Sequence, residues 1–296
     1  MRSSIVALPL FFLSFRHALA ATYQITDSYQ GSAFLEQFNF KTFDDPTHGY
    51  VNYVDRSTAQ KEGLVQVSGT NFTLRADDQS VPRSGARGRD SVRIESKKTY
   101  GRHVSIYNVV HMPKGCGRKR ADAAGPNAVT LHTSSGCSVP HSRKMTGTVK
   151  STECSSGRGS NTGCGVTLKS DSSFGQDFNS NQGGFYAMER AENGIRVWFW
   201  KRGDKRTPKD VLDGDDDIDT RSWGTPDALF PDSSCDIDSH FTDQNIVINL
   251  TFCGDWAGSN AYSQAGCPGT FTDFVKNDPR EFSLAYFSIL WVKVYE

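Results

Sequence analysis

The stretch FYAMERAENGIRVWFW, residues 185–200, predicts a β-hairpin. Its two arms are rich in aromatic and β-branched residues, which favour strands over helices. Asn193-Gly194 favours the positive φ angles of a tight hairpin turn between them. Antiparallel strands are therefore the first structural element that this chain specifies.

The second arm of the hairpin presents two different faces, because alternate residues of a strand point in opposite directions. The apolar set, which we expect in a core between two sheets, is Ile195, Val197 and Phe199. The opposite set is Arg196, Trp198 and Trp200. This second set suits a groove that stacks sugar rings, or equally an aromatic strand half covered by loops.

The strand pattern continues on both sides of the hairpin. Further segments with this character are 64–77, 90–100, 102–112, 128–133, 245–252 and 286–296, and only 273–285 is typical of a short helix. Polar turn residues separate them. Many short strands without helix alternation or internal repeats predict an all-β fold, a two-sheet sandwich or jelly roll.

The amino terminus has the pattern of a secretory signal peptide. Arg2 precedes an apolar run over 5–15, and Ala18-Leu19-Ala20 forms a small-residue cleavage site. The run is interrupted by Pro9 and is too short to cross a hydrocarbon core of ~30 Å. We therefore predict a signal peptide over 1–20 and a single secreted domain over 21–296, without membrane attachment.

The balance of charges limits the kinds of partner that this chain can bind. Cleavage after Ala20 would remove two arginines and no acid, which leaves 31 basic and 33 acidic residues and no basic excess for a nucleic-acid partner. We expect a monomer.

The seven cysteines predict disulfides, with one thiol left over, and two of them pin surface loops within 151–184. Their spacing fits no zinc site, so no metal is expected. The sequons at Asn71 and Asn249 are candidate glycosylation sites.

No motif for nucleophilic or phosphate chemistry is present. The chain lacks G-x-S-x-G and phosphate-binding glycine loops, and the acidic stretch 211–220 departs from the EF-hand pattern, so we expect a solvated loop there and no cofactor. Glycoside hydrolysis would need two carboxylates facing one sugar. Among eight glutamates, only Glu189 and Glu192 lie close together, and we expect them to be exposed beside the hairpin turn.

Longer motifs resemble a known family. They are DPTHGYVNYVD, SVRIESKKTY, VVHMPKGCG, PNAVTLHT, GGFYAMER, WGTPDALFP, NIVINLTFCGDWAG and AGCPGT. From about residue 21 to 296 the chain resembles fungal glycoside hydrolase family 16, specifically secreted endo-1,3(4)-β-glucanases of the laminarinase type. The resemblance implies a β-jelly-roll sandwich of the concanavalin A-like lectin and glucanase type. It also implies a cleft for β-1,3- or mixed-linked β-glucan, cut with retention by a strand motif E-x-D-x-x-E.

That catalytic motif is missing from the place where the family carries it. The GCG of residues 115–117 is joined to PNAVTLHT only by RKRADAAG, residues 118–125. We therefore predict a jelly roll incomplete at one central strand, with no catalytic residue. The family also commonly has another cysteine where Phe271 stands, which explains the odd cysteine count.

The resemblance assigns four residues to the region of the glucan cleft. They are Asn52, Arg93, His132 and Trp256. Trp256 could stack on a sugar face, while Arg93 and His132 could bind hydroxyl groups. Each of the four also suits an ordinary structural role.

Two classes of function follow. One is a secreted β-glucanase whose sequence here has lost an exon, and the other is a non-catalytic, lectin-like β-glucan-binding protein. As written, the chain is expected to be hydrolytically inactive and poorly stable, because the neighbours of an absent strand lose hydrogen-bond partners at ~1 to 3 kcal/mol for each buried group.

Overall fold

The computed structural model describes residues 22–115, 127–157, 162–255, 262–264 and 266–296. Three predicted features lie outside the described residues: the signal peptide over 1–20, the bridge over 118–125 and the side chain of Trp256.

The described chain is dominated by strands, as predicted. The strands are β1 Thr22–Tyr29, β2 Phe38–Phe40, β3 Val51–Tyr53, β4 Val65–Ser68, β5 Asn71–Arg75, β6 Arg89–Ser91, β7 Arg93–Tyr100, β8 His103–His111, β9 Ala128–Leu131, β10 Thr148–Val149, β11 Cys164–Thr167, β12 Gly184–Ala191, β13 Gly194–Lys201, β14 Asp217–Asp219, β15 Ala228–Pro231, β16 Gln244–Asn249 and β17 Tyr286–Tyr295.

The helices are short and lie in the connections. The α-helices are α1 Ala33–Gln37, α2 Arg56–Lys61, α3 Gly175–Ser180, α4 Lys209–Asp213, α5 Ile237–His240, α6 Tyr262–Gln264 and α7 Phe271–Asn277. The 3₁₀-helices are η2 Asp171–Ser173, η3 Thr220–Trp223, η4 Asp232–Ser234 and η6 Pro279–Phe282. In the described part of the chain, no helix has the length and apolar content needed to cross a membrane.

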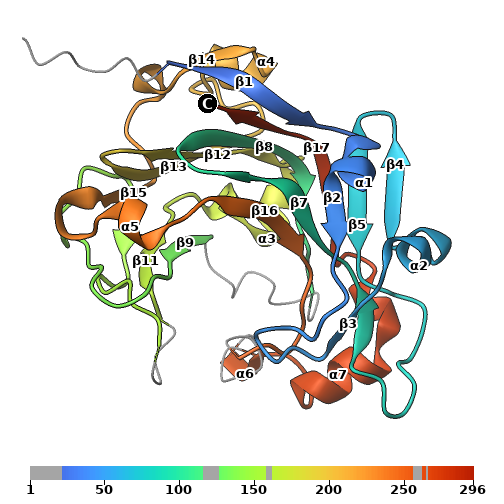
Figure 1. The fold of residues 1–296 in the computed structure, drawn as a ribbon. Helices are drawn as coiled ribbons and strands as arrows, with labels where there is room; N and C mark the ends of the chain where they lie inside the picture. Colours follow the sequence, from blue (N-terminus) through green and yellow to red (C-terminus); the bar gives the residue numbers. More distant parts are fainter. Residues whose placement is uncertain (1–21, 116–126, 158–161, 256–261, 265) are drawn as a thin grey trace, which may run out of the picture.

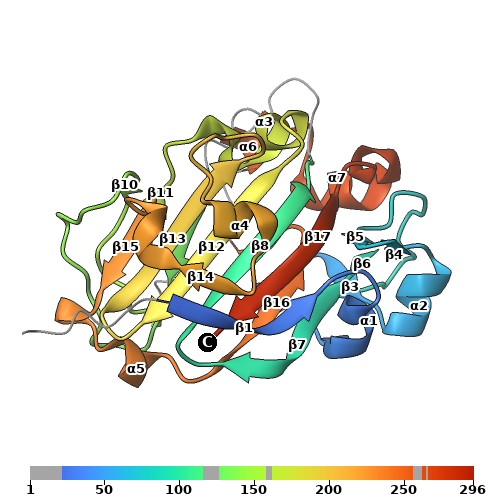
Figure 2. The same cartoon turned by 90° about the horizontal axis from the view of Figure 1, so that it is seen from above.

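One layer of the fold is a nine-stranded sheet, which we call the large sheet. Its main path runs β14-β1-β17-β8-β12-β13-β15, with β5 also paired to β17 and β4 paired to β5. Its strands pair in antiparallel fashion, and the long strands β8, β12, β13 and β17 form its centre (Figures 1 and 2).

The second layer consists of two three-stranded sheets, β2-β7-β16 and β9-β11-β10, which we call the small layer. Both pack on the same side of the large sheet (Figure 1). Ile94 and Ile248 of the first sheet share a buried cluster with Val109 and Ile289 of the large sheet. Val166 of the second sheet shares another buried cluster with β13 and β15. The predicted two-sheet sandwich is therefore confirmed.

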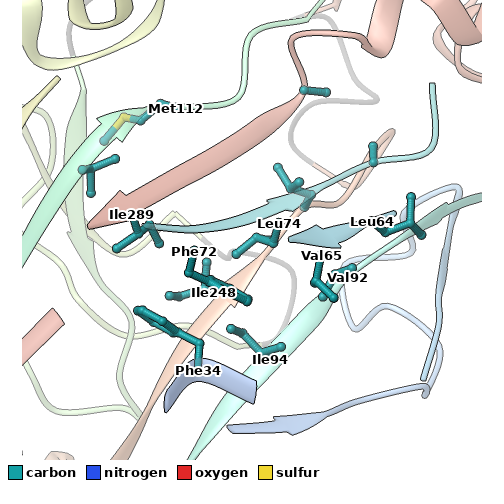
Figure 3. Close-up of a cluster of buried hydrophobic side chains, with 14 of the residues drawn as sticks. Phe34, Leu64, Val65, Phe72, Leu74, Val92, Ile94, Met112, Ile248 and Ile289 are labelled. Carbon is teal, nitrogen blue, oxygen red and sulfur yellow. The ribbon is translucent and has the colours of Figure 1, made fainter. Parts of the chain in front are cut away.

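The sandwich core follows from strand alternation. In β7, Ile94 is buried while its neighbours Arg93 and Glu95 are only half-buried, and β16 repeats this pattern at Ile248. Figure 3 shows Ile94 and Ile248 close to Phe34 and Phe72, which stack with ring centroids 4.6 Å apart. Apolar side chains at every second position thus bind the layers together.

The hairpin that the sequence predicted is β12–β13, but its turn lies one residue earlier than expected. Ala191 pairs with Gly194, so the two turn residues are Glu192 and Asn193. Neither of them has a positive φ, whereas Gly194 does. Glycine is needed there because a Cβ would lie 2.4 Å from the carbonyl oxygen of Phe230 on the adjacent strand β15.

The aromatic face of β13 is covered, so the sugar-stacking groove on that face was a wrong alternative. Trp198 and Trp200 are 3% and 6% exposed. Both meet the ring of Trp223 edge to face, at centroid distances of 5.2 and 5.7 Å. The loop segment that carries η3 therefore packs onto this side of the large sheet, as the alternative of an aromatic strand under loops predicted.

Other boundaries differ from the pattern-based expectation. Segment 64–77 is two strands, β4 and β5, because Gly69 adopts a positive φ and lets the chain turn back. Segment 273–285 is split between α7 and η6, since Pro279 cannot continue an α-helix. In the acidic stretch 211–220, the acids at 215–217 are exposed as expected, but Ile218 is buried and β14 pairs with β1.

Two disulfides join described residues, Cys137–Cys235 and Cys154–Cys164. The second closes the loop that we expected a disulfide to pin. Cys267 is disulfide-bonded as well, and Cys253 is a free cysteine. Cys253 is half-buried, and burial raises the pKa of its thiol to about 12, so the thiol stays protonated at neutral pH.

Candidate functional site

The side of the small layer that faces away from the large sheet carries polar residues, and we call it the polar face. Arg93 and Glu95 of β7 and Asn249 of β16 point to it, because their neighbours Ile94 and Ile248 point into the core. Asn249 lies opposite Arg93 in the antiparallel register. Two strands thus place guanidinium, carboxylate and amide groups side by side.

Arg93 is held in place by two kinds of contact. Its Nε and Nη2 donate to Oε1 of Glu95, at 3.2 and 3.1 Å, and Lys41 pairs with Oε2 of the same carboxylate at 3.1 Å. Its guanidinium also lies over the ring of Phe43, 5.2 Å from the centroid. Phe43 is 43% exposed, so the polar face includes an aromatic ring that can contact a ligand.

Asn52 lies at the parallel pair β3–β6, where it is directly opposite Asp90. Its amide nitrogen donates to Oδ1 of Asp90 over 2.5 Å, and its amide oxygen accepts from Nε and Nη2 of Arg87 over 3.0 and 2.7 Å. Nη1 of Arg87 in turn donates to Asp44 and to the carbonyl oxygen of Thr42. The predicted residue Asn52 is therefore the centre of a hydrogen-bonded group.

Segment 42–44 connects these two groups. Phe43 contacts Arg93, while Thr42 and Asp44 on either side of it bind Arg87. Two of the four predicted binding residues, Asn52 and Arg93, thus belong to one connected polar region, and from here on the polar face includes the group around Asn52. Sequence reasoning missed Arg87 and Asp90, since only the pairing of β3 with β6 brings this distant part of the chain next to Asn52. It also missed Phe43, which contacts Arg93 from the loop after β2.

Asp45 anchors this region to β3 and to the segment that follows β16. Its carboxylate accepts hydrogen bonds from the side chains of Thr47, Tyr53 and Thr251 and from the backbone of Gly49. Burial by itself would raise the pKa of Asp45, but these hydrogen bonds together outweigh burial and lower the pKa below its usual value. The aspartate is thereby a fixed negative charge that organises the loop.

The other two predicted binding residues are not part of this region. His132 follows β9 on the other small sheet and is exposed. Trp256 lies outside the described residues. The roles of all four residues in binding stay predictions.

The candidate glycosylation sites differ in their surroundings. Asn71 begins β5 at a hairpin, and its amide oxygen accepts from Ser288. Asn249 lies within β16, and its amide nitrogen donates to the hydroxyl of Tyr53 over 2.9 Å. A glycan on Asn249 would have to share that nitrogen, which makes Asn71 the sterically simpler site. Modification of either asparagine remains a prediction.

Glu189 is buried, contrary to expectation, and the exposed pair of glutamates does not exist. Its side chain is 3% exposed, and its carboxylate accepts from Tyr23, Thr220 and Arg196 at 3.1, 2.7 and 2.9 Å. The N-terminal strand β1 and the segment at Thr220 cover this side of the hairpin. Glu192, in contrast, is exposed as predicted.

Glu189 lies at a cavity of about 870 Å³ that Tyr23, Trp198 and Thr220 also line. Because its carboxylate has three donors, including the Arg196 guanidinium, it forms a satisfied structural ion pair. Elsewhere, Cys137, Cys235 and His240 place their ligand atoms within 4.8 Å of one another, but the two sulfurs are joined in a disulfide and offer no thiolate to a metal.

Chemically, the polar face suits recognition of a neutral ligand that is rich in hydroxyl groups. It offers guanidinium and amide donors, carboxylate acceptors and the ring of Phe43. Of the eight glutamates, all of which are described, Glu95 is the one that β7 places on this face, and Arg93 and Lys41 hold its carboxylate. Hydrolysis of a glycosidic bond needs two carboxyl groups, one on each side of the bond, that lie about 5 to 9 Å from each other.

The chain matches the model of the XgeA-like, catalytic glycoside hydrolase family 16 domain. The match covers residues 38–121 and 119–295 as two stretches that meet at 119–121. This junction falls within the bridge RKRADAAG identified from the sequence.

Curated relatives are fungal. A probable glycosidase of Schizosaccharomyces pombe is 38% identical over 300 residues, which cover 94% of this chain and 70% of the relative. The endo-1,3(4)-β-glucanase of Arthroderma benhamiae is 35% identical over 305 residues, covering 94% of this chain and 65% of the relative. A probable endo-1,3(4)-β-glucanase of Aspergillus fumigatus is 36% identical, and the chain spans 46% of its length. The chain thus spans between 46% and 70% of the length of these relatives.

Solved structures of family 16 proteins are also similar to this chain. Laminarinase 16A from Phanerochaete chrysosporium, with β-glucans (6-O-glucosyl-laminaritriose) in both donor and acceptor sites, has a TM-score of 0.90 and 45% identity. The alignment covers 93% of this chain and all of that one. An elongating family 16 β-1,3-glucosyltransferase has a TM-score of 0.82 and 34% identity, with the same coverage of both chains. These matches confirm the predicted jelly-roll fold.

Proposed function

The chain belongs to glycoside hydrolase family 16, and we propose that it is a secreted protein of the endo-1,3(4)-β-glucanase lineage that binds β-1,3- or mixed-linked β-glucan on its polar face. As written, we further propose, it does not hydrolyse the glucan. The observation that carries the binding proposal is the connected group of Asn52, Arg87 and Arg93 around the exposed ring of Phe43.

The group suits a sugar chain for two reasons. Among the described residues, Arg93 donates from Nε and Nη2 to Glu95 alone, whereas Arg87 donates from Nε and both Nη atoms, so Arg93 is the better donor to a ligand. Guanidinium donors match hydroxyl oxygens well. Phe43 offers an aromatic face, on which the C–H groups of a sugar ring can pack. The related laminarinase, whose solved structure contains β-glucans in donor and acceptor sites, supports glucan as the ligand.

The proposal that this chain is inactive rests on the carboxylates. Retaining hydrolysis needs a nucleophile and an acid about 5 Å apart. Glu95, the glutamate that β7 places on the polar face, is tied to Lys41 and Arg93, and no second glutamate follows it on that strand. The family match that divides at residues 119–121 supports a missing catalytic segment at that point of the chain.

Two origins of this chain are compatible with the proposal. In the first, the gene encodes a working β-glucanase, and RKRADAAG results from reading across a wrong splice junction. In the second, the protein is a true lectin-like binder that has lost its carboxylates. We favour the first for the gene, because family character continues up to the junction on both sides.

The deciding experiment is to sequence the transcript across codons 115–128. A transcript that encodes E-x-D-x-x-E at this point restores the enzyme. A transcript that encodes RKRADAAG supports the binding protein. Independently, calorimetric titration of the purified chain with laminarin oligosaccharides tests binding, and absence of heat at millimolar oligosaccharide would sink the proposal for the polar face.

A further inference from the structure

Arg89, at the start of β6, carries a fully buried guanidinium. Its side chain is 0% exposed, and the guanidinium lies over the ring of Phe282, 4.6 Å from the centroid. Burial lowers the pKa of Arg89, because it removes water from the charge. A buried cation needs acceptors for its N–H groups, so the acceptors of Arg89 identify the segments that it holds together.

All five N–H groups of this guanidinium donate to backbone carbonyl oxygens. Nε and Nη2 donate to Val275 over 2.8 and 2.5 Å, and Nη2 also donates to Lys276 over 3.3 Å. Nη1 donates to Asp77 and to Ser80, over 2.9 Å each. One side chain of β6 therefore binds both the end of α7 and the loop that follows β5.

The end of α7 lacks a donor that Arg89 supplies. In a longer helix, the carbonyl oxygen of Val275 would accept from the N–H of residue 279, but Pro279 has no N–H. The last carbonyl oxygens of a helix also carry a partial negative charge, which favours a cation. Arg89 thus satisfies oxygens that the helix leaves without a partner, and the helix end stabilises the buried charge.

The strand that carries Arg89 has little support from its own sheet. Among the described residues, β3 and β6 form a separate two-stranded sheet of three residue pairs. A sheet of two strands has little stability of its own. The strands also approach closely beside Arg89, since a Cβ on Gly88 would lie 2.1 Å from the carbonyl carbon of Tyr50. A small shift of β6 would therefore change its contacts with β3.

The residues on either side of Arg89 bind the side-chain amide of Asn52. Arg87 donates to the amide oxygen over 3.0 and 2.7 Å, and Asp90 accepts from the amide nitrogen over 2.5 Å. The backbone of Asp90 is held as well, because its carbonyl oxygen accepts from the N–H of Asp77 over 2.9 Å. The position of β6 thus sets the orientation of an amide on the polar face.

We propose that Arg89 is a positioning residue for the binding of β-glucan. By fixing β6 to α7 and to the loop at Asp77, it holds Arg87 and Asp90 against Asn52 and so orients the amide that the polar face offers to sugar hydroxyls. Because Arg89 is buried, it acts through these residues and does not reach the sugar itself. This inference rests on the glucan binding proposed above and adds the residue that maintains the geometry of that site.

Two substitutions test the guanidinium and its support. Arg89→Lys keeps the charge, but the three N–H groups of an ammonium diverge from one atom and cannot serve α7, Asp77 and Ser80 together. Phe282→Leu is the milder change, because it removes only the ring under the guanidinium and leaves the acceptors of all five hydrogen bonds in place.

Glu189→Gln is the matched control. Glu189 is also a buried charge, 3% exposed, and pairs with Arg196 over 2.9 Å. Its other partners are Tyr23 of β1 and Thr220 of η3. None of these elements carries a residue of the polar face, so this substitution should destabilise the fold without disturbing the amide of Asn52.

Two measurements are made on each variant. Calorimetric titration with laminarin oligosaccharides gives the affinity, at a temperature at which thermal unfolding shows the variant to be folded. Hydrogen exchange followed by mass spectrometry gives the rate of local opening in segments 50–54 and 87–91, with segment 184–201 as the reference for Arg89→Lys and Phe282→Leu.

We expect Arg89→Lys to bind about tenfold more weakly and to exchange about tenfold faster in segments 50–54 and 87–91, with the reference segment unchanged. Phe282→Leu should weaken binding about threefold, with a smaller rise in the same exchange rates. Glu189→Gln should lower Tm and change the affinity by less than about twofold.

The outcomes separate this inference from the proposed function. Unchanged exchange in segments 50–54 and 87–91 of Arg89→Lys, or an affinity equal to that of the natural chain, would overturn the inference and leave glucan binding intact. An equal loss of affinity in Glu189→Gln would also overturn it, because any destabilisation would then weaken binding. No binding by the natural chain would refute the glucan site itself, and with it the role of Arg89 in binding. If Arg89→Lys does not fold, Phe282→Leu decides by the same two measurements.

Discussion

The side-chain amide of Asn249 donates a 2.9 Å hydrogen bond to the hydroxyl of Tyr53, which in turn donates to Asp45 over 3.0 Å. This chain of contacts links β16, β3 and the loop that follows β2. It therefore holds the polar face to the rest of the small layer.

Asp45 should be the most important single residue of this link. Asp45→Ala leaves four donors without their acceptor in a largely buried place, and we expect it to lower the free energy of unfolding by about 3 kcal/mol. Urea denaturation measures the change. The adjacent variant Asp44→Ala is the matched control, because its carboxylate is 86% exposed, and it should change stability by less than about 0.5 kcal/mol.

The same aspartate predicts a dependence on pH. Because the folded protein lowers the pKa of Asp45 below its ordinary value of 3.8, the charged form stabilises the fold above that value, and this contribution disappears as the pH falls through the lower, folded pKa. The stability difference between the natural chain and Asp45→Asn should therefore be constant from pH 7 to 5 and shrink below about pH 4. Denaturation series at several pH values check this, and a difference that grows on acidification would contradict it.

The two described disulfides should contribute unequally. Cys137 and Cys235 are 98 residues apart, while Cys154 and Cys164 are 10 apart. Loop-closure entropy in the unfolded chain predicts a loss of about 5 kcal/mol when the first pair is replaced by alanine and about 3 kcal/mol for the second. The double-alanine variants, compared by urea unfolding under oxidising conditions, test the order. Equal losses would mean that the length of the closed loop does not determine how much each disulfide stabilises the fold.

Binding of glucan should depend on the polar face. Arg93→Ala removes a guanidinium that both donates hydrogen bonds and packs on Phe43, and we expect laminarin oligosaccharides to bind about tenfold more weakly, which is about 1.4 kcal/mol. Calorimetry gives the affinity. Arg206→Ala, an equal change of charge at a side chain that is 86% exposed in a different loop, should leave the affinity unchanged.

Much of the fold was predictable because alternation is a local signal. The strands β7, β8, β12, β13, β16 and β17 each have an apolar side, and the sequence shows it directly. The burial of Glu189 was not predictable, because Tyr23 and Thr220, which bind it, lie 166 and 31 residues away. The hydrogen-bonded group around Asn52 was not predictable for the same reason. Arg87 and Asp90 reach Asn52 only through the parallel pairing of β3 and β6, which no local pattern encodes.

We have proposed that this chain binds β-glucan on its polar face and lacks the carboxylate pair for hydrolysis. The most direct test is to incubate the purified chain with laminarin and to measure the release of reducing ends over several hours, beside a related active laminarinase. We predict release no faster than in a sample without protein. Turnover at the rate of an ordinary laminarinase would contradict the claim.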